Sequence, residues 1–213
     1  MTETPPTPTK PHAPAAVPPK PAAPAAPAPA AAPAKPPEPQ LPPIDMTEVD
    51  ALKAIIGEAI TEMGRQTDKP VAVIATPRVL DALRAAKTEL KYEHLANYTA
   101  ADYPLKKYIE IVYNLYSYPK KKHLVLKTRV PRENTAAPSL VPMWSGANWD
   151  EREMFDLLGI KFEGHPNLTR LFLPENWKGH PLRKDYPLQE EQWIGMDEKG
   201  HDVAYQTPGD DRW

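Results

Sequence analysis

The clearest structural signals in this chain lie in residues 148–187, NWDEREMFDLLGIKFEGHPNLTRLFLPENWKGHPLRKDYP. Asn148 can cap the start of a helix, and Glu151, three residues later, can reach back to close a capping box. Gly159 supplies the left-handed residue that commonly ends a helix. We therefore predict a helix that begins at Asn148 and runs to Leu158.

The rest of this stretch is expected to form short strands and an extended segment. Residues 160–164 (IKFEG) and 168–173 (LTRLFL) each have the length of a short strand, with a turn at 165–167 between them. Residues 177–187 contain two prolines and follow neither the strand period nor the helix period. Because proline removes a backbone donor, this part is predicted to run extended over a surface.

The predicted helix mixes charged and apolar side chains. Acidic groups near a helix start are favoured by the helix dipole, by about 0.3–1 kcal/mol each, so one interpretation is a solvated helix start. The second interpretation is a docking surface, because apolar side chains stand on more than one side of this short helix and should cover some of its charges. A covered charge needs a partner. The nearest cationic candidates are Arg170, Arg183 and Lys184.

Residues 151–187 closely resemble the signature region of the C subunit of bacterial NADH-quinone oxidoreductase, which is the small peripheral-arm subunit of respiratory complex I. Upstream, the turn at 100–104 and the hairpin after it resemble the family more loosely, and residues 1–43 do not resemble it. The matching positions are Glu151-Arg152-Glu153, Asp156, Gly159-Ile160, Phe162, Gly164-His165-Pro166, Leu168, Arg170 and the run from Gly179 to Pro187.

The resemblance implies an α+β domain without a cofactor of its own. It would pack against the quinone-site subunit and the adjacent iron–sulfur subunits, on the cytoplasmic side of the cell membrane. The assembled enzyme would oxidise NADH and reduce quinone with FMN and iron–sulfur clusters, while moving ions across the membrane. The alternative within this class is the same module in a membrane-bound hydrogenase or another donor-dehydrogenase complex.

On this interpretation the charged and aromatic residues of the C-terminal half lie at interfaces with neighbouring subunits, and none is catalytic. The predicted interface residues are Glu151, Arg152, Glu153, Asp156, His165, Arg170, His180, Arg183, Lys184, Asp185, Trp193 and Tyr205.

A stand-alone enzyme is the alternative from a different class. His165 and His180 each lie in a Gly-His-Pro sequence and, with a carboxylate from Glu151, Glu153 or Asp156, would make a plausible metal set for a hydrolase. Each Gly-His-Pro is also typical of a turn. No phosphate-binding glycine loop or nucleophile elbow is present. The chain contains no cysteine, which excludes disulfides and cysteine-ligated iron–sulfur clusters.

The segments that flank the predicted domain have a different composition. Residues 1–43 hold 17 of the 29 prolines, and we predict a disordered Pro/Ala-rich arm. Residues 188–213 are acidic and contain aromatic residues without a period, so we expect an extended tail that docks on a partner through Trp193 and Tyr205. The whole chain has a formal net charge of −2 and no basic aromatic face, which argues against nucleic-acid binding. No apolar run approaches the ~20 residues of a membrane span.

Residues 44–187 are predicted to form one domain. The expected elements are a helix from Asp45 or Thr47 to Gly64, a strand at 71–75, a helix from Thr76 to Lys91, a strand at 94–103, and a hairpin of 108–116 with 124–130. Alternation in the hairpin places Ile109, Ile111, Tyr113 and Leu115 on its buried face. The predicted fold class is therefore α+β, a largely antiparallel sheet with helices on one face.

Overall fold

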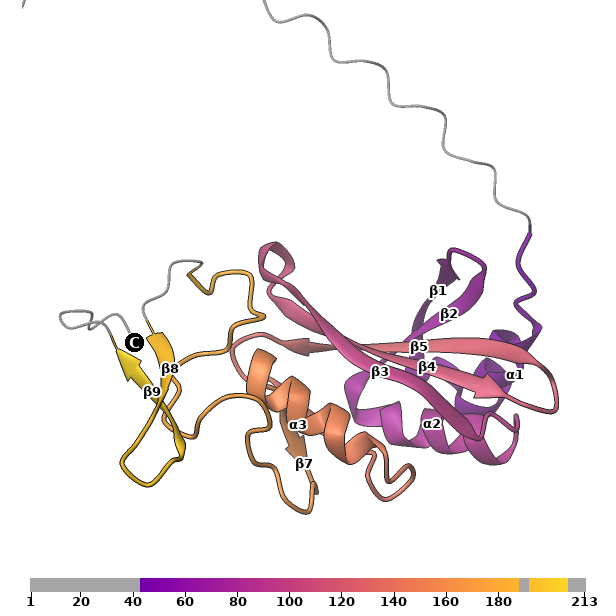
Figure 1. The fold of residues 1–213 in the computed structure, drawn as a ribbon. Coiled ribbons are helices and arrows are strands. Elements are labelled where there is room, and N and C mark those ends of the chain that lie inside the picture. The colour runs from indigo at the N-terminus through magenta and orange to yellow at the C-terminus, as the bar shows by residue number, and fades with distance from the viewer. Residues whose placement is uncertain (1–42, 188–191, 207–213) are drawn as a thin grey trace, which may run out of the picture. The chain divides into compact units, whose positions relative to one another are not determined.

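The computed structural model describes residues 43–187 and 192–206, so the predicted Pro/Ala-rich arm lies outside the described residues. Figure 1 shows the elements in chain order. They are α1 (Thr47–Ile56), β1 (Ile60–Gln66), β2 (Lys69–Ile74), α2 (Val79–Thr88), β3 (His94–Tyr103), β4 (Tyr108–Ser117), β5 (Lys122–Pro131), β6 (Ala136–Pro138), α3 (Ala147–Leu158), β7 (Lys161–Glu163), β8 (Gln192–Met196) and β9 (Asp202–Gln206).

Five strands form one mixed sheet in the order β1-β2-β5-β4-β3. The pairs β1–β2, β5–β4 and β4–β3 are antiparallel, and only β2 and β5 run parallel within this sheet. The parallel pair is connected through α2, β3 and β4, as a parallel connection requires a crossover. The predicted α+β class with a largely antiparallel sheet is confirmed.

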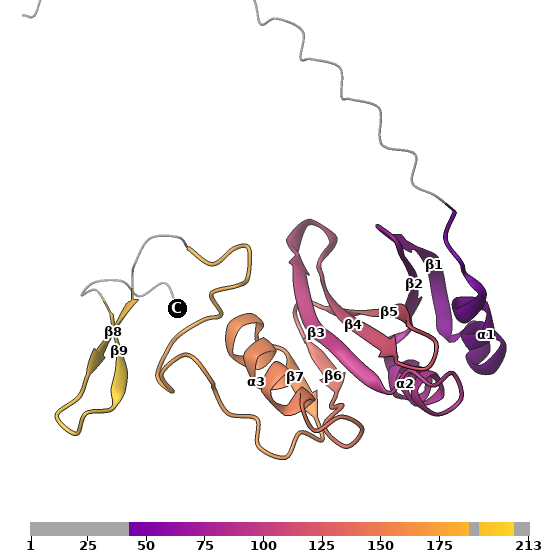
Figure 2. The ribbon, with the colours of Figure 1, turned by 45° about the vertical axis from the view of Figure 1, so that its right-hand side comes forward.

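The core lies on one face of this sheet. Ile109, Ile111, Tyr113 and Leu115 of β4 are fully buried, which confirms the predicted alternation of that strand. Apolar side chains of α1, α2 and α3 complete the same cluster. In Figure 1 the helices α2 and α3 lie beneath the sheet, and Figure 2 shows α3 beside β3 and α2 below β4. The sheet therefore supports α3 from one side.

The first helix is shorter than predicted. It ends at Ile56, because Gly57 adopts φ +63° and its N–H bonds to the carbonyl of Lys53. The next strand, β1, forms a hairpin with β2 through a turn at Thr67 and Asp68. The prediction that the helix continues to Gly64 is wrong. The chain reverses at Thr67 and Asp68, and these two residues are not the Asn-Gly or Asp-Gly pair that would indicate a hairpin turn in the sequence.

The second helix also starts later than predicted. Residues Thr76–Arg78 form a 3₁₀ turn with Pro77 near its start, and α2 begins only at Val79. The Thr76 hydroxyl donates to the carbonyl of Arg129 at 3.0 Å and so does not cap the helix. The predicted helix start at Thr76 is wrong, because this residue belongs to a separate turn that its hydroxyl joins to β5.

Of the two strands predicted after α3, one is present. β7 pairs in parallel with β6, a strand that the sequence pattern does not indicate. Residues 168–173 form no strand, because the N–H groups of Leu171, Phe172 and Leu173 all donate to the carboxylate of Asp156. Three consecutive donors that converge on one oxygen cannot take part in a β-ladder.

The acidic tail contains a hairpin in its described part. β8 and β9 pair antiparallel, with Trp193 opposite Tyr205. The sequence predicts an extended segment here, yet the loop from Asp197 to His201 reverses the chain. The N–H groups of Lys199 and His201 donate to the Asp197 carboxylate, and Gly200 adopts φ +79°. Asp197 and Gly200 lie three residues apart in this short polar loop, and such turn residues would have indicated the hairpin.

Candidate functional site

The helix α3 and the loop that follows it, residues 164–187 (the C-terminal loop), contain most of the predicted interface residues. The helix begins at Ala147 after Gly146, and no side chain caps it. The predicted capping box of Asn148 and Glu151 is therefore wrong. Gly159 does end the helix in the left-handed conformation, with φ +74°, as predicted.

Glu151 faces the interior instead of the helix start. Its side chain is 0% exposed and accepts hydrogen bonds from the Ser139 hydroxyl and the Leu140 N–H, each at 2.6 Å. Burial raises the pKa of Glu151 to about 7, although both hydrogen bonds act in the opposite direction. This carboxyl joins α3 to the segment after β6, and among residues 43–187 and 192–206 no cationic side chain forms an ion pair with it.

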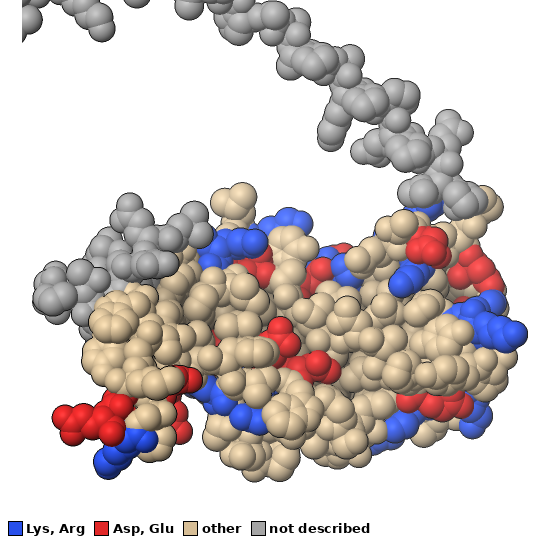
Figure 3. Space-filling model, in the orientation of Figure 1, with Lys and Arg blue, Asp and Glu red and all other residues tan. Residues whose placement is uncertain are grey.

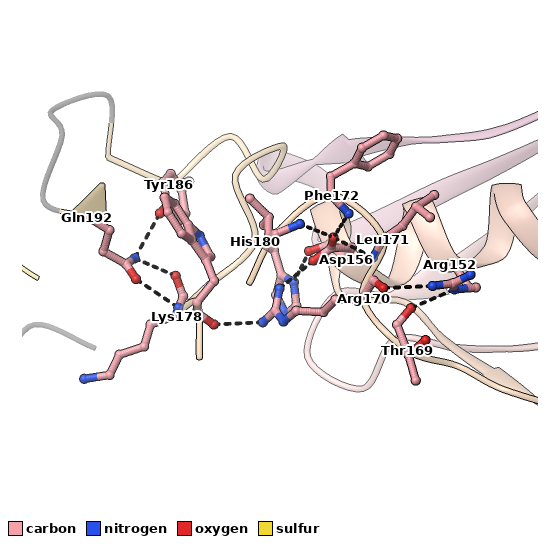
Figure 4. A network of polar contacts seen from close by, with 12 residues as sticks. Arg152, Asp156, Thr169, Arg170, Leu171, Phe172, Lys178, His180, Tyr186 and Gln192 are labelled. Atoms are coloured by element: carbon pink, nitrogen blue, oxygen red, sulfur yellow. Dashed lines mark hydrogen bonds and ion pairs between the residues drawn. The ribbon is translucent and has the colours of Figure 1, made fainter. Parts of the chain in front are cut away.

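Asp156 holds the C-terminal loop against α3. Its carboxylate, also 0% exposed, accepts from the N–H groups of Leu171, Phe172 and Leu173 at 2.8–3.1 Å and from Arg170 Nη1 at 2.6 Å. Figure 4 shows these donors converging on the carboxylate. Burial alone would raise the pKa of Asp156, but the donors outweigh it and hold the pKa below its ordinary value. Arg170, one of the three cationic candidates that the sequence offers, is therefore the partner of this covered carboxylate.

Arg152 binds the same loop one turn earlier on the helix. Its Nε donates to the carbonyl of Thr169 at 3.1 Å and its Nη2 to the carbonyl of Arg170 at 3.0 Å. The guanidinium also lies over the Trp149 ring, 5.1 Å from the centroid. Arg152 thus binds carbonyl groups of the loop, and Asp156 binds its N–H groups, so that both hold residues 169–173 on α3 (Figure 4).

The second half of the C-terminal loop returns to the end of α3. His180 Nδ1 donates to the carbonyl of Asp156 at 2.9 Å, and Arg183 Nε donates to the carbonyl of Leu158 at 2.8 Å. These side chains satisfy carbonyl groups that a helix end leaves without partners. Burial and the neighbouring Arg183 lower the pKa of His180 below its ordinary value.

Gly159 makes this close approach possible, and its substitution is the first test of the loop geometry. A Cβ at position 159 would lie 2.6 Å from the His180 ring and 3.0 Å from Arg183 Nη2. We expect Gly159→Ala to lower the free energy of unfolding by about 2 kcal/mol, because the backbone is left-handed here and the ring must move. Urea denaturation of the full chain measures this change. Gly64→Ala, where nothing lies within 4 Å, is the control and should change stability by much less.

A third anchor joins the loop to the sheet. Arg132 Nε donates to the buried carboxylate of Asp102 at 2.7 Å, and its Nη1 donates to Asp185 at 3.1 Å. The Lys184 N–H donates to Asp102 at 2.9 Å. Burial would raise the pKa of Asp102, but the Arg132 guanidinium and this N–H lower it below its ordinary value. Asp185 is therefore paired with Arg132 within the chain.

The remaining predicted residues do not form a metal site. Nδ1 of His165 accepts the Asn167 N–H at 3.0 Å, so its Nε2–H donates to the carbonyl of Asn148 at 3.3 Å. Glu153 is exposed on α3. Nowhere in residues 43–187 and 192–206 do three His, Cys, Asp or Glu side chains gather in a way that could hold a metal ion. The geometry gives no support to a hydrolase that uses His165 and His180.

Large apolar side chains remain exposed around these anchors. Trp149 on α3 and Phe172 and Leu182 on the C-terminal loop are each more than half exposed. In the β8–β9 hairpin, Trp193 is 53% exposed and Tyr205 is 37% exposed. Most charged residues of the signature region, residues 151–187, thus form contacts within this chain. The large apolar side chains of Trp149, Phe172 and Leu182 are exposed to solvent.

Several residues of the site have no signal in the sequence. Ser139 lies after β6, 12 residues before its partner Glu151, and Asp102 lies on β3, 30 residues before its partner Arg132. Asn176 bonds through its side-chain amide to the backbone of Ala204 in β9. Such contacts depend on tertiary placement, whereas sequence periodicity reports only neighbours within one element. Within the described ranges, no helix is long and apolar enough to span a membrane.

The comparisons with known proteins agree with the resemblance noted in the sequence. Residues 72–192 match the model of a family described as "Respiratory-chain NADH dehydrogenase, 30 Kd subunit". The NADH-quinone oxidoreductase C subunit of Moorella thermoacetica is 41% identical over 130 residues, which cover 61% of this chain and 88% of the relative. The protein of the same name from Geobacter sulfurreducens is 39% identical over 140 residues, or 65% of this chain and 86% of the relative.

A solved structure also matches this chain. It is described as "Nqo5 of the trypsin-resistant fragment (1-134) in P63 form". The two chains are 26% identical and superpose with a TM-score of 0.50, and the match covers 57% of this chain and 99% of that fragment.

Proposed function

The chain belongs to the family of the 30-kDa subunit of respiratory-chain NADH dehydrogenase and is a subunit of an NADH-quinone oxidoreductase, and from this premise we propose that it acts as a docking subunit without catalytic residues of its own. Its partners are the quinone-site subunit and the adjacent iron–sulfur subunits, on the cytoplasmic side of the membrane. Residues 44–187 form the domain proper, and residues 188–213 form the partner-docking tail. For Arg152, Asp185 and the other predicted interface residues, contact with another chain stays a prediction.

One observation carries this proposal. The carboxylates and guanidinium groups of the motif hold the C-terminal loop on α3, and this arrangement leaves Phe172 and Leu182 exposed at 59% and 53%. Large apolar side chains on a rigid loop are what a partner surface can bury. The backbone donors of this loop are already satisfied within the chain. The loop therefore presents its apolar side chains to a partner with little further loss of conformational entropy on binding.

The proposal assigns all redox cofactors to other subunits. The full sequence contains no cysteine, so cysteine thiolates cannot bind an iron–sulfur cluster in this chain. NADH, FMN, the clusters and quinone would be bound elsewhere in the complex. This chain would contribute by fixing the positions of the subunits that carry electrons.

Purification of the tagged full chain from its own cells in mild detergent tests the proposal. We expect the other subunits of an NADH-quinone oxidoreductase to co-purify in fixed proportion, with NADH-dependent quinone reduction in the same fraction. If the chain is recovered as a monomer, or with a hydrogenase that does not react with NADH, the proposed function is wrong.

Arg152→Ala tests the link between the loop and docking. The change removes the donors to the carbonyls of Thr169 and Arg170, on the loop surface that carries Phe172. We expect the variant to fold, because Arg152 is only partly buried. The yield of assembled complex at native expression should nevertheless be several-fold lower than for wild type. Arg84→Ala, an exposed arginine of α2, is the control. Normal assembly of the Arg152 variant would show that the loop surface does not dock.

A further inference from the structure

Two side-chain amides join the β8–β9 hairpin to the C-terminal loop. Asn176 Nδ2 donates to the carbonyl of Ala204 at 2.8 Å, and its Oδ1 accepts from the Ala204 N–H at 2.9 Å. Gln192 Oε1 accepts from the Lys178 N–H at 3.0 Å, and its Nε2 donates to the Lys178 carbonyl at 2.8 Å. Since a side-chain amide presents a donor beside an acceptor, as a peptide group does, each residue reproduces one hydrogen-bonded pair of an antiparallel ladder.

The two amide pairs run in opposite directions, which fixes the hairpin at two points. Asn176 reaches from the loop to the backbone of β9, whereas Gln192 reaches from β8 to the backbone of the loop. Gln192 is 6% exposed and its Nε2 also lies 3.2 Å from the Tyr186 hydroxyl, as Figure 4 shows. A single contact would leave the hairpin free to rotate, but two contacts determine which of its faces turns away from the loop.

The face that turns away carries a preassembled aromatic stack. Trp193 lies opposite Tyr205 in the ladder, and their rings stack with centroids 4.6 Å apart and an angle of 20° between planes. Gly195 leaves space for the rings, since a Cβ there would lie 2.8 Å from Trp193 and 2.9 Å from Tyr205. Ala204, which points the other way, is buried. The stack is therefore formed by residues of this chain alone.

Charge around the stack indicates the chemistry of the partner. Ile194 and Met196 of β8 are 49% and 73% exposed, so the hairpin offers apolar area on both faces. Its turn and the start of β9 contain the acidic residues Asp197, Glu198 and Asp202 against one lysine, and Figure 3 shows red side chains gathered at this tip. An acidic tip beside exposed aromatics is complementary to an apolar pocket rimmed by basic side chains.

We propose that Asn176 and Gln192 are positioning residues that aim the Trp193–Tyr205 stack into an apolar pocket, rimmed by lysine and arginine, on a protein partner in the complex. This inference rests on the proposed function. It adds the residues that orient the hairpin and the kind of surface that receives it. Bound in this way, the hairpin holds the acidic tail on the neighbouring subunit.

Isosteric substitutions in the full chain test the orientation. Asn176→Asp and Gln192→Glu keep the acceptor of each amide pair but place a negative oxygen against the carbonyl of Ala204 or Lys178. We expect the hydrogen-exchange protection of the Ala204 N–H to fall at least about tenfold in Asn176→Asp, and that of the Lys178 N–H to fall similarly in Gln192→Glu. Asn134→Asp adds the same charge at an exposed loop residue and is the matched control. Protection unchanged from wild type in both variants would overturn the proposal.

A change of pH separates positioning from general damage. Below about pH 4 the carboxyl introduced by Asn176→Asp is protonated and regains a donor. The near-ultraviolet circular dichroism of the aromatic stack should then return toward that of wild type. A misfolded variant would not recover its signal, and lack of recovery would show that the amide pair does not set the hairpin orientation.

Assembly measurements test the receiving surface. In complex purified from cells, Asn176→Asp, Trp193→Ala and the charge reversal Glu198→Lys should each reduce incorporation of the chain at least about fivefold, while Asn134→Asp assembles normally. If wild type itself does not assemble, the proposed function fails. If wild type assembles and Trp193→Ala or Asn176→Asp does so equally well, only the inference about the hairpin fails. Normal assembly of Glu198→Lys would show that the partner's pocket is not rimmed by basic side chains.

Discussion

Asp156→Ala is expected to lower the free energy of unfolding of the full chain by about 3–5 kcal/mol. This is the cost typical of removing one member of a buried charge pair. The substitution leaves the N–H groups of Leu171, Phe172 and Leu173 without their acceptor and leaves Arg170 without its carboxylate. Urea denaturation followed by circular dichroism measures the loss. Trypsin cleavage at Arg170 should become faster, because residues 170–173 lose the carboxylate that holds them on α3, although Arg152 still contacts the loop.

Two further substitutions separate the effect of charge from that of shape. Asp156→Asn keeps one acceptor oxygen and the size of the side chain, but replaces the negative oxygen with a donor that faces other donors. It should therefore lose nearly as much stability as the alanine variant. Glu153→Ala, at an exposed acidic position of the same helix, should change stability by less than about 0.5 kcal/mol. A loss below about 1 kcal/mol in Asp156→Ala would show that the carboxylate does not hold the loop.

The elements that the sequence predicts correctly are those with a strong local signal. The alternation in β4, the pairing of β4 with β5 and the left-handed Gly159 all follow from patterns within a few residues. The β1 strand is missed because its residues after Ile60 are exposed, so that it has no apolar face to reveal its period. The β8–β9 hairpin is missed because its strands carry aromatics on a face away from the core, although its loop contains the turn residues Asp197 and Gly200.

The site is predictable only in part, for a physical reason. The sequence indicates that charged groups on α3 are covered and need partners, and Arg170 is the partner of Asp156. It cannot indicate that the chain's own C-terminal loop covers these charges. The donors in that loop are backbone N–H groups, which nearly every residue type has, so the sequence does not distinguish them. Glu151 illustrates the same limit, since its partners Ser139 and Leu140 precede the helix and are uncharged.

Glu151→Gln should remove the pH dependence that this buried carboxyl imposes on stability. The pKa of Glu151 is raised to about 7 in the folded chain, against 4.5 for an unperturbed glutamate. Between these values the folded state binds more protons than the unfolded state, so the free energy of unfolding falls as pH rises from about 4.5 to 7. The total loss is on the order of 3 kcal/mol, at about 1.4 kcal/mol for each pH unit.

The glutamine variant escapes this loss because its amide carries no charge to bury. Its oxygen can accept from the Leu140 N–H, and its NH₂ can donate to the Ser139 hydroxyl oxygen, so the contacts of Glu151 are kept. At pH 8 we expect Glu151→Gln to be more stable than wild type by about 1–3 kcal/mol, and at pH 5 to be equal to it or less stable. Urea denaturation at both pH values gives the comparison.

Glu153→Gln provides the reference, because that side chain is exposed on the same helix and should show no such difference between the two pH values. If wild type and Glu151→Gln keep the same difference in unfolding free energy from pH 5 to pH 8, Glu151 ionises normally in the folded chain. A charged carboxylate at this place would then need a cation or water beside it, which the contacts with Ser139 and Leu140 do not supply. The measurement therefore decides whether this motif glutamate stabilises the domain as a neutral hydrogen-bonding group or as an ion.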